Sequence, residues 1–433
     1  MKDFGFGEFL SKLRKRQGLT QEELAKRLNV SNKAVSKWEN GTARPTIDRV
    51  QLLADIFGIS IEELLTKKNA KAKKIAKIVI TGGPCAGKST AMIWIQEHFE
   101  KQGYGVLFIP ECATELILGG VSGWTMESNY EFEFAILKMQ QQKERIFDEC
   151  AQKLFGKDKV LIVCDRGYLD CKAYMEDYEF TEAMQALGLE ENEVRDSYDG
   201  VFHLVSVAKD APQFYTYETN KARFETIEEA IENDTKTLNA WMGHPHLRIV
   251  DNATDFEGKM RRLLKEISCL LGEPVPYEIE RKFLVKLPDL EMLEKENNCK
   301  KVEIIQTYLQ STEDEVRVRQ RGVNGGYTYT KTVKKNIEGM KRVEYEERIT
   351  QQEYLNLLME ADTTKKQIRK TRYCFVFNNQ YFELDVYPFW KNKALLEIEL
   401  DDENKDIEMP SFIKVIKEVT DDEKYKNASL AKL

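Results

Sequence analysis

The segment GGPCAGKST, residues 82–90, is the part of the sequence that most directly indicates chemistry. It follows a β-branched run at residues 78–81 and precedes apolar residues at helical spacing. Between a strand and a helix, such glycines let backbone N–H groups face a phosphate chain, the lysine neutralises the outer phosphates and the serine can ligate magnesium. The pattern is that of a P-loop, and it predicts a site for ATP or GTP.

A second carboxylate for that site is expected at Asp165, which ends the apolar run VLIVCD. The next residues are Arg166 and Gly167 rather than a glutamate, so the hydrolytic base of ring-forming ATPases is missing, and DRGYLD resembles the DRG element of nucleoside and nucleotide kinases. Ser89 and Asp165 are the expected metal ligands. The expected nucleotide-binding residues are Gly82, Gly83, Gly87, Lys88, Ser89, Thr90, Asp165, Arg166, Arg223 and Asn252.

Arg223 and a histidine pair further along the chain each have two interpretations. Arg223 precedes a helical stretch, where kinases carry a lid arginine, but it could equally be a surface arginine. Asn252 follows the last predicted strand, where P-loop kinases often touch the base. His244 and His246 could bind a metal, although a loop before that strand is the favoured interpretation.

Charged residues of both signs alternate with apolar ones from residue 277 onward. The segment EIERK places Glu278, Glu280 and Lys282 on one strand face, because side chains alternate with period two. RVRQR, RVEYE, ELD and EIE repeat the spacing further on. One solvated sheet face would explain this, but a closed sheet with a charged lumen also explains the apolar residues of the other face. Basic residues would then hold a polyphosphate, and carboxylates its divalent cations.

EIERK matches the ExExK signature, and residues 277 to about 430 resemble the CYTH, or triphosphate tunnel metalloenzyme, superfamily. The resemblance implies Mg²⁺- or Mn²⁺-dependent chemistry on a nucleoside triphosphate or inorganic tripolyphosphate. It implies catalytic roles for Glu278, Glu280, Lys282, Glu397 and Glu399. By position it also implies the metal ligands Glu278, Glu280, Asp385, Glu397 and Glu399, and the phosphate-binding residues Lys282, Arg317, Arg319, Lys331, Arg369 and Arg372.

The first 66 residues read as short helices with strong capping signals. Thr20 with Glu23 forms a capping box, and Ser31 can cap the next helix. LTQEELAKRLNVSNKAVSKWENGTARP resembles the helix-turn-helix of the Cro/C1 repressor family, which implies binding to double-stranded DNA, with a homodimer favoured because one module reads a half-site. The expected DNA-binding residues are Gln21, Asn32, Lys33, Ser36 and Lys37. A helical bundle used only for protein contact is the alternative.

Apolar runs at residues 106–109, 160–164, 201–207 and 247–250 join the strand before the P-loop in a predicted five-stranded, mainly parallel sheet. Residues 76–272 resemble P-loop domains related to the ribosylnicotinamide kinase module of NadR proteins and to the insect TRPL-translocation protein family. The resemblance implies nucleotide binding and leaves the phosphate acceptor open.

Length and charge fit this division. A chain of 433 residues suggests roughly three domains. Residues 1–74 carry 16 Lys and Arg against 9 Asp and Glu, whereas the whole chain has a net charge of -8. We predict an all-α head (1–68), a lysine-rich linker (69–75), an α/β P-loop domain (76–272) and an antiparallel β tunnel barrel with helices (277–433).

The eight cysteines form no CxxC pair, and no stretch has the length and apolar character of a membrane helix, so a cytoplasmic protein without membrane insertion is expected. The favoured function is a DNA-binding protein that hydrolyses a triphosphate in the barrel and binds nucleotide at the P-loop. The alternative is a nucleotide-sensing transcription regulator whose barrel binds its ligand without turnover, and a kinase with an accessory barrel is a third hypothesis.

Overall fold

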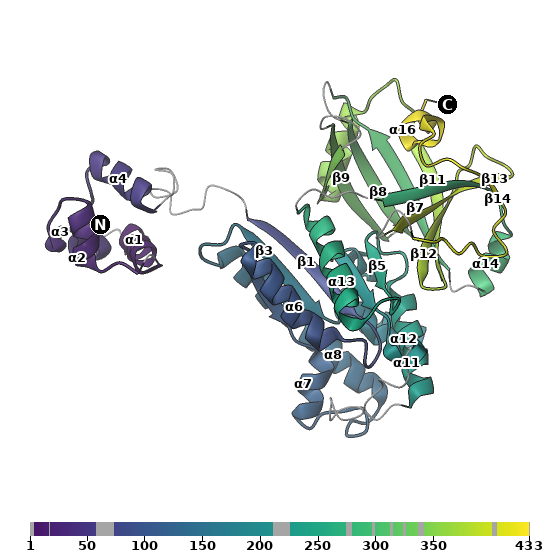
Figure 1. Cartoon of the computed structure of the whole chain (residues 1–433), viewed down its shortest axis with the longest axis horizontal. Helices are drawn as coiled ribbons and strands as arrows, with labels where there is room; N and C mark the ends of the chain where they lie inside the picture. Colours follow the sequence, from purple (N-terminus) through teal and green to yellow (C-terminus); the bar gives the residue numbers. More distant parts are fainter. Residues whose placement is uncertain are drawn as a thin grey trace. The chain divides into compact units, whose positions relative to one another are not determined.

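The computed structural model describes residues 4–16, 18–57, 73–210, 226–273, 279–296, 299–311, 315–323, 326–336, 342–400 and 405–432 (Figure 1). The chain forms two compact units, Met1–Lys74 and Ile75–Leu433. Each unit is described by itself. The predicted fold class, with an all-α head, a parallel α/β sheet and a C-terminal antiparallel sheet, is confirmed.

The head consists of α1 (Phe4–Arg16), α2 (Gln21–Arg27), α3 (Asn32–Glu39) and α4 (Ile47–Phe57). The predicted caps are present: Thr20 and Glu23 form the capping box of α2, and the Ser31 hydroxyl accepts from the backbone N–H of Ala34. A fifth helix, expected near Ile61, lies outside the described residues. The helices pack around a core that includes Leu10, Leu24, Leu28, Val35, Trp38 and Leu53.

Within the larger unit, the central domain is built on a parallel sheet of order β2-β3-β1-β4-β5, as expected. Its strands are β1 (Lys74–Thr81), β2 (Gly105–Ile109), β3 (Lys159–Asp165), β4 (Gly200–Leu204) and β5 (Leu247–Val250). β1 begins at Lys74, inside the segment expected to be linker. Its helices are α6 (Lys88–Lys101), α7 (Cys112–Leu118), α8 (Asn129–Lys153), η1 (Tyr168–Ala173), α9 (Asp177–Ala186), α10 (Glu191–Arg195), α11 (Val207–Asp210), α12 (Ile227–Trp241) and α13 (Phe256–Leu271).

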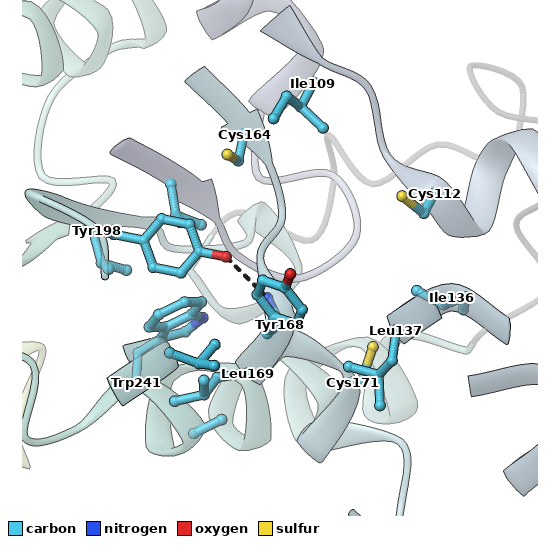
Figure 2. Close-up of a cluster of buried hydrophobic side chains, with 14 of the residues drawn as sticks. Ile109, Cys112, Ile136, Leu137, Cys164, Tyr168, Leu169, Cys171, Tyr198 and Trp241 are labelled. Carbon is cyan, nitrogen blue, oxygen red and sulfur yellow. Dashed lines mark hydrogen bonds between the residues drawn. The ribbon is translucent and has the colours of Figure 1, made fainter. Parts of the chain in front are cut away.

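Both faces of this sheet are covered, which explains why its strands are apolar throughout. One core joins strand residues to α6 and α13, for example Ile95 and Leu263. The other joins the opposite face to α8, η1 and the end of α12. Figure 2 shows part of this second core, where Tyr198 and Trp241 pack beside Tyr168 and Leu169, just after the end of β3.

The C-terminal domain is a nine-stranded antiparallel sheet of order β10-β9-β8-β7-β11-β12-β13-β6-β14, curled on itself in Figure 1. The strands are β6 (Ile279–Lys286), β7 (Lys300–Tyr308), β8 (Glu315–Val323), β9 (Gly326–Asn336), β10 (Arg342–Arg348), β11 (Ile368–Phe377), β12 (Gln380–Val386), β13 (Lys393–Leu400) and β14 (Val415–Glu418). The helices are α14 (Leu290–Glu296), α15 (Gln351–Leu357), η3 (Leu358–Glu360), η4 (Glu423–Tyr425) and α16 (Asn427–Leu430). In the parts of the chain that the structure describes, no helix has the length and apolarity needed to span a bilayer.

Candidate functional site

The P-loop connects β1 to α6. Gly82 and Gly87 have φ values of 135° and 92°, a backbone conformation that favours glycine, and Gly87 is the N-cap of α6. Lys88 is turned back onto the loop, since its Nζ donates to the carbonyls of Gly82 at 2.8 Å and Gly83 at 3.2 Å. Ser89 and Thr90 are exposed at the start of the helix. The loop therefore presents its helix N-terminus and two hydroxyls to solvent.

Asp165 ends β3 beside this loop. Burial raises the pKa of its carboxyl to about 6, although Lys88 opposes the shift. Its Oδ1 is buried and has no hydrogen-bond donor among the described residues. A buried carboxylate oxygen without a donor suits a magnesium ligand, so the predicted pair of Ser89 and Asp165 fits the ion.

Arg166 follows with a φ of 66° and is held by two carboxylates. Its Nε donates to Oε1 of Glu111 at 2.5 Å, and its Nη1 donates to Oδ1 of Asp170 at 3.2 Å. Burial raises the pKa of Glu111, but the positive charges of Arg166 and Lys88 outweigh it and lower that pKa to about 2. Glu111 is therefore ionised and engaged, so Asp165 is the better placed of the two carboxylates to meet a ligand.

A cavity of about 490 Å³ lies next to Lys88 and Arg166. Its lining is largely apolar, with contributions from α7 and α8, and it includes Trp124 and the buried carboxyl of Glu133. Burial raises the pKa of Glu133 to about 7. Sequence reasoning missed Glu133, because one glutamate on a helical face carries no local signal of burial.

Other predicted residues of the central domain have structural partners. Asn252 donates to the carbonyl of Ser206 at 3.1 Å and accepts from Lys259 at 2.8 Å. His244 Nε2 lies 3.0 Å from the carbonyl of Tyr198. Arg223 lies outside the described residues.

Strand register places most of the predicted site residues of the C-terminal domain on one face of its sheet. Directly opposed residues in an antiparallel pair share a face. The pairs Lys282–Glu397, Glu280–Glu399, Glu383–Glu397, Arg372–Asp385, Gln306–Arg319 and Glu346–Thr332 link these strands. Arg372 opposes Val302 and Thr332 opposes Arg317, which joins both halves of the sheet. We call this surface the charged face.

The basic and acidic side chains of the charged face contact one another. Arg372 lies 2.7 Å from Asp385 and 2.7 Å from Glu397, and it also pairs with Glu383. Lys282 Nζ lies 2.7 Å from Glu397 Oε1. Although burial acts in the other direction, Lys282 and the neighbouring cations hold the pKa of Glu397 well below its usual range. Glu397 is therefore ionised, and carboxylate oxygens are ligands of the type that Mg²⁺ and Mn²⁺ prefer.

Two predicted phosphate-binding residues are on the wrong face. Lys331 opposes Val318 and Glu347, and its Nζ lies 3.6 Å from Glu347. Arg369 opposes Ile305 and donates to Gln367. Both are one residue out of phase with the charged face, because a single step along a strand reverses the side-chain direction.

The neighbouring Lys370 lies on the charged face instead and pairs with Asp385. Lys370 and Arg372 are two residues apart on one strand and therefore share a face, so the sequence already indicated that Lys370 lies with Arg372. Arg321 and Glu383 were missed in the same way. Glu278 and the side chain of Glu344 lie outside the described residues.

In the head, α3 exposes Asn32, Lys33 and Lys37, as expected for a recognition helix, whereas Ser36 is half-buried. Gln21 was expected to reach a DNA phosphate. Its Nε2 donates instead to Glu39 at 2.8 Å, and Glu39 also accepts from Arg14. Gln21 therefore braces α2 against α3 in this structure.

Three families match successive parts of the chain: a helix-turn-helix over residues 10–64, an AAA domain over residues 77–259 and a CYTH domain over residues 276–426. The HTH-type transcriptional activator BcrR of Enterococcus faecalis is 43% identical over 61 residues, which are 14% of this chain and 30% of that protein. The uncharacterized HTH-type transcriptional regulator y4dJ of Sinorhizobium fredii is 38% identical over 60 residues, 14% of this chain and 78% of that protein. This chain thus spans about a third of BcrR.

Among solved structures, that of the inorganic triphosphatase NE1496 is 30% identical, and the match covers 36% of this chain and 95% of that one, with a TM-score of 0.26. Through its head, the chain belongs to the helix-turn-helix family of transcriptional regulators. In this member of the family, an AAA domain with a P-loop and a CYTH domain follow the head.

Proposed function

We propose that this chain is a DNA-binding regulator whose CYTH domain hydrolyses a triphosphate with Mg²⁺ or Mn²⁺ and whose P-loop binds ATP or GTP. The observation that supports it most is the charged face, where Lys282 and Arg372, both partly buried, form an ionic network with the buried Glu397. Such a network is costly to bury unless it serves a ligand or is fully paired. A nucleoside triphosphate or tripolyphosphate fits its basic side chains.

In the proposed reaction, Lys282, Arg317, Arg319, Lys370 and Arg372 bind and orient the phosphates. The carboxylates Glu278, Glu280, Asp385, Glu397 and Glu399 would hold the cation. Bound Mg²⁺ or Mn²⁺ supplies charge neutralisation and an activated water for attack on the terminal phosphorus. Mutual ion pairs hold Lys282 and Arg372 on the charged face before the ligand arrives, and the phosphates and the cation would replace those pairs.

For the central domain, we propose nucleotide binding with Lys88 moving from the loop carbonyls to the phosphates. The cavity beside Lys88 favours phosphoryl transfer to a small acceptor over simple hydrolysis, because it offers a mostly apolar compartment next to the expected position of the outer phosphates. The acceptor class stays open. A nucleotide-sensing regulator without turnover in the barrel is the second candidate function, and it is favoured by the head.

A screen of the purified full chain against nucleoside triphosphates and tripolyphosphate, with Mg²⁺ and with Mn²⁺, tests these proposals. Phosphate, pyrophosphate and cyclic nucleotide are measured separately. We expect phosphate release that Lys282→Ala abolishes and Lys88→Ala leaves intact. If Lys88→Ala removes all turnover while Lys282→Ala retains it, the barrel is not the enzyme. Binding without any turnover in the intact chain would favour the sensor.

A further inference from the structure

The central and C-terminal domains meet at one end of the charged face. Arg321 of β8 lies 3.1 Å from Asp196, Thr328 of β9 donates to Asp196 at 2.8 Å, and Arg348 of β10 donates to the carbonyl of Tyr198 at 2.6 Å. All three C-terminal residues lie on the charged face by register. The strands β8, β9 and β10 thus each contribute a charged-face residue that contacts the central domain.

The opposite end of the charged face is apolar. Leu284, Tyr308, Tyr387 and Leu395 form a buried cluster with Leu430 of α16. Along β13, Leu395 is followed on the same face by Glu397 and then by Glu399. The ionic network therefore lies between this apolar cluster and the central domain. On β13, Glu399 is the acidic residue of the network that lies nearest to the central domain.

Glu399 is paired with a residue of the central domain. Arg248, on β5, makes an ion pair with Glu399 and lies 3.3 Å from Glu266 of α13. The two side chains line a cleft between the domains together with Glu397, Arg262 and Lys405. The Arg248 and Glu399 side chains keep 22% and 32% of their exposure, against 5% and 4% for Arg321 and Asp196. The Arg321–Asp196 pair can act as a fixed anchor, whereas the Arg248–Glu399 pair is accessible to a ligand.

We propose that Arg248 is part of the polyphosphate site of the CYTH domain, so that this site is shared between two domains. A polyphosphate lying along the charged face would bind the guanidinium of Arg248, and the accompanying cation would bind the carboxylate of Glu399. The ion pair between Arg248 and Glu399 is thereby replaced by two contacts between opposite charges, one with the phosphate and one with the cation. This inference rests on the proposed function of the charged face.

The proposal makes Arg248 sensitive to the length of the phosphate chain. The Glu280–Glu399 pair lies two residues along the strands from the Lys282–Glu397 pair, which corresponds to roughly 7 Å. A chain of phosphates can span that separation, whereas a single phosphate held by Lys282 cannot. Arg248 should therefore matter for tripolyphosphate and much less for orthophosphate.

Calorimetric titration of the full chain with tripolyphosphate, pyrophosphate and orthophosphate tests this, with Mn²⁺ and in EDTA. We expect Arg248→Ala to weaken tripolyphosphate binding about 10- to 100-fold, the range for a lost hydrogen bond to a charged group, with a smaller loss for pyrophosphate and little for orthophosphate. Arg248→Lys should fall in between. Arg261→Ala is the matched control, because Arg261 is exposed on α13 and pairs only locally with Glu257.

A second variant removes the carboxylate of Glu399, which competes with the polyphosphate for Arg248, and leaves the arginine in place. In EDTA, Glu399→Gln should bind tripolyphosphate more tightly than the unaltered chain, because Arg248 loses its ion pair with Glu399 and keeps the one with Glu266. A merely structural ion pair would give the same loss of stability in both variants and no dependence on chain length.

The outcomes separate the two levels of the hypothesis. If Lys282→Ala loses tripolyphosphate binding but Arg248→Ala matches Arg261→Ala for all three anions, the shared site is wrong and the function of the charged face stands. If the unaltered chain binds no tripolyphosphate under either condition, the proposed function is wrong and the shared site with it.

Discussion

Arg321 and Asp196 form a buried ion pair in which Nη1 lies 3.1 Å from Oδ1. Arg321 also donates to the carbonyl of Gly243 at 2.6 Å, and Asp196 accepts from Arg195 at 2.7 Å. Although burial acts in the other direction, Arg195 and Arg321 lower the pKa of Asp196. The pair therefore joins the central and C-terminal domains through charges that are satisfied on both sides.

Removing the Asp196 carboxylate should strongly destabilise the unit formed by the central and C-terminal domains. Asp196→Ala leaves two buried arginines without their carboxylate, and breaking a buried pair costs about 3–5 kcal/mol. Arg321→Ala should cost less, since Asp196 keeps Arg195. Chemical denaturation followed by tryptophan fluorescence measures both. Asp177→Ala is the control, because that aspartate is 89% exposed and such pairs contribute about 0–1 kcal/mol. Equal effects of Asp196→Ala and Asp177→Ala would contradict this account.

Two adjacent residues of β11 test the strand register. Lys370 lies on the charged face and pairs with Asp385, whereas Arg369 lies on the other face. We expect Lys370→Ala to reduce kcat/KM for tripolyphosphate by at least about tenfold, the effect of losing one charge-assisted phosphate contact. Arg369→Ala should change it less than about twofold. The reverse order of effects would show that the register is shifted by one residue.

Glu133 should make stability depend on pH. Burial raises the pKa of its carboxyl from 4.5 to about 7, so the folded chain retains a proton that the unfolded chain releases. Its stabilising contribution is complete below pH 4.5 and is lost as the pH rises through about 7. Glu133→Gln should therefore raise the free energy of unfolding by about 2–4 kcal/mol at pH 8 and change it little at pH 4. Unfolding curves at both pH values check this, and an equal effect at both would exclude a buried neutral carboxyl.

The head should bind duplex DNA through α3. Lys33 and Lys37 are exposed on this helix, and each phosphate contact adds about -0.9 to the slope of log K against log salt. Lys33→Ala/Lys37→Ala should weaken binding to a mixed-sequence duplex and reduce the slope by about two. Fluorescence anisotropy at several salt concentrations measures both. Lys15→Ala, on α1, is the control for loss of one positive charge outside α3, and an equal effect per charge removed would place the contact elsewhere.

Local signals in the sequence predicted much of this fold. The capping box at Thr20, the P-loop between β1 and α6 and the carboxyl end of β3 at Asp165 are each defined by a few consecutive residues. The charged face required more, because it depends on which of two alternating sets faces inward. The ExExK motif indicates the face of Lys282, but no comparable motif covers β9 and β11, where Lys331 and Arg369 lie on the face opposite to the one predicted.

Contacts between domains could not be predicted in this way. Arg321 continues the alternation of Arg317 and Arg319, yet its partner is Asp196, which lies 125 residues earlier in the chain. Arg248 stands in a short apolar strand that gives no indication of Glu399. Burial of Glu133 likewise depends on the elements that pack over α8. These features follow from tertiary packing, which a single sequence does not encode in any local pattern.

The anchoring of charged-face residues in the central domain limits how this protein can be divided. A fragment beginning near residue 277 would leave the guanidinium groups of Arg321 and Arg348 without the partners they have in the full chain. Truncation of the gene at that point should give a poorly folding product, while a cut before Lys74, where β1 begins, should not. Recombination between related genes would accordingly exchange the head alone and transmit the remaining residues as one block.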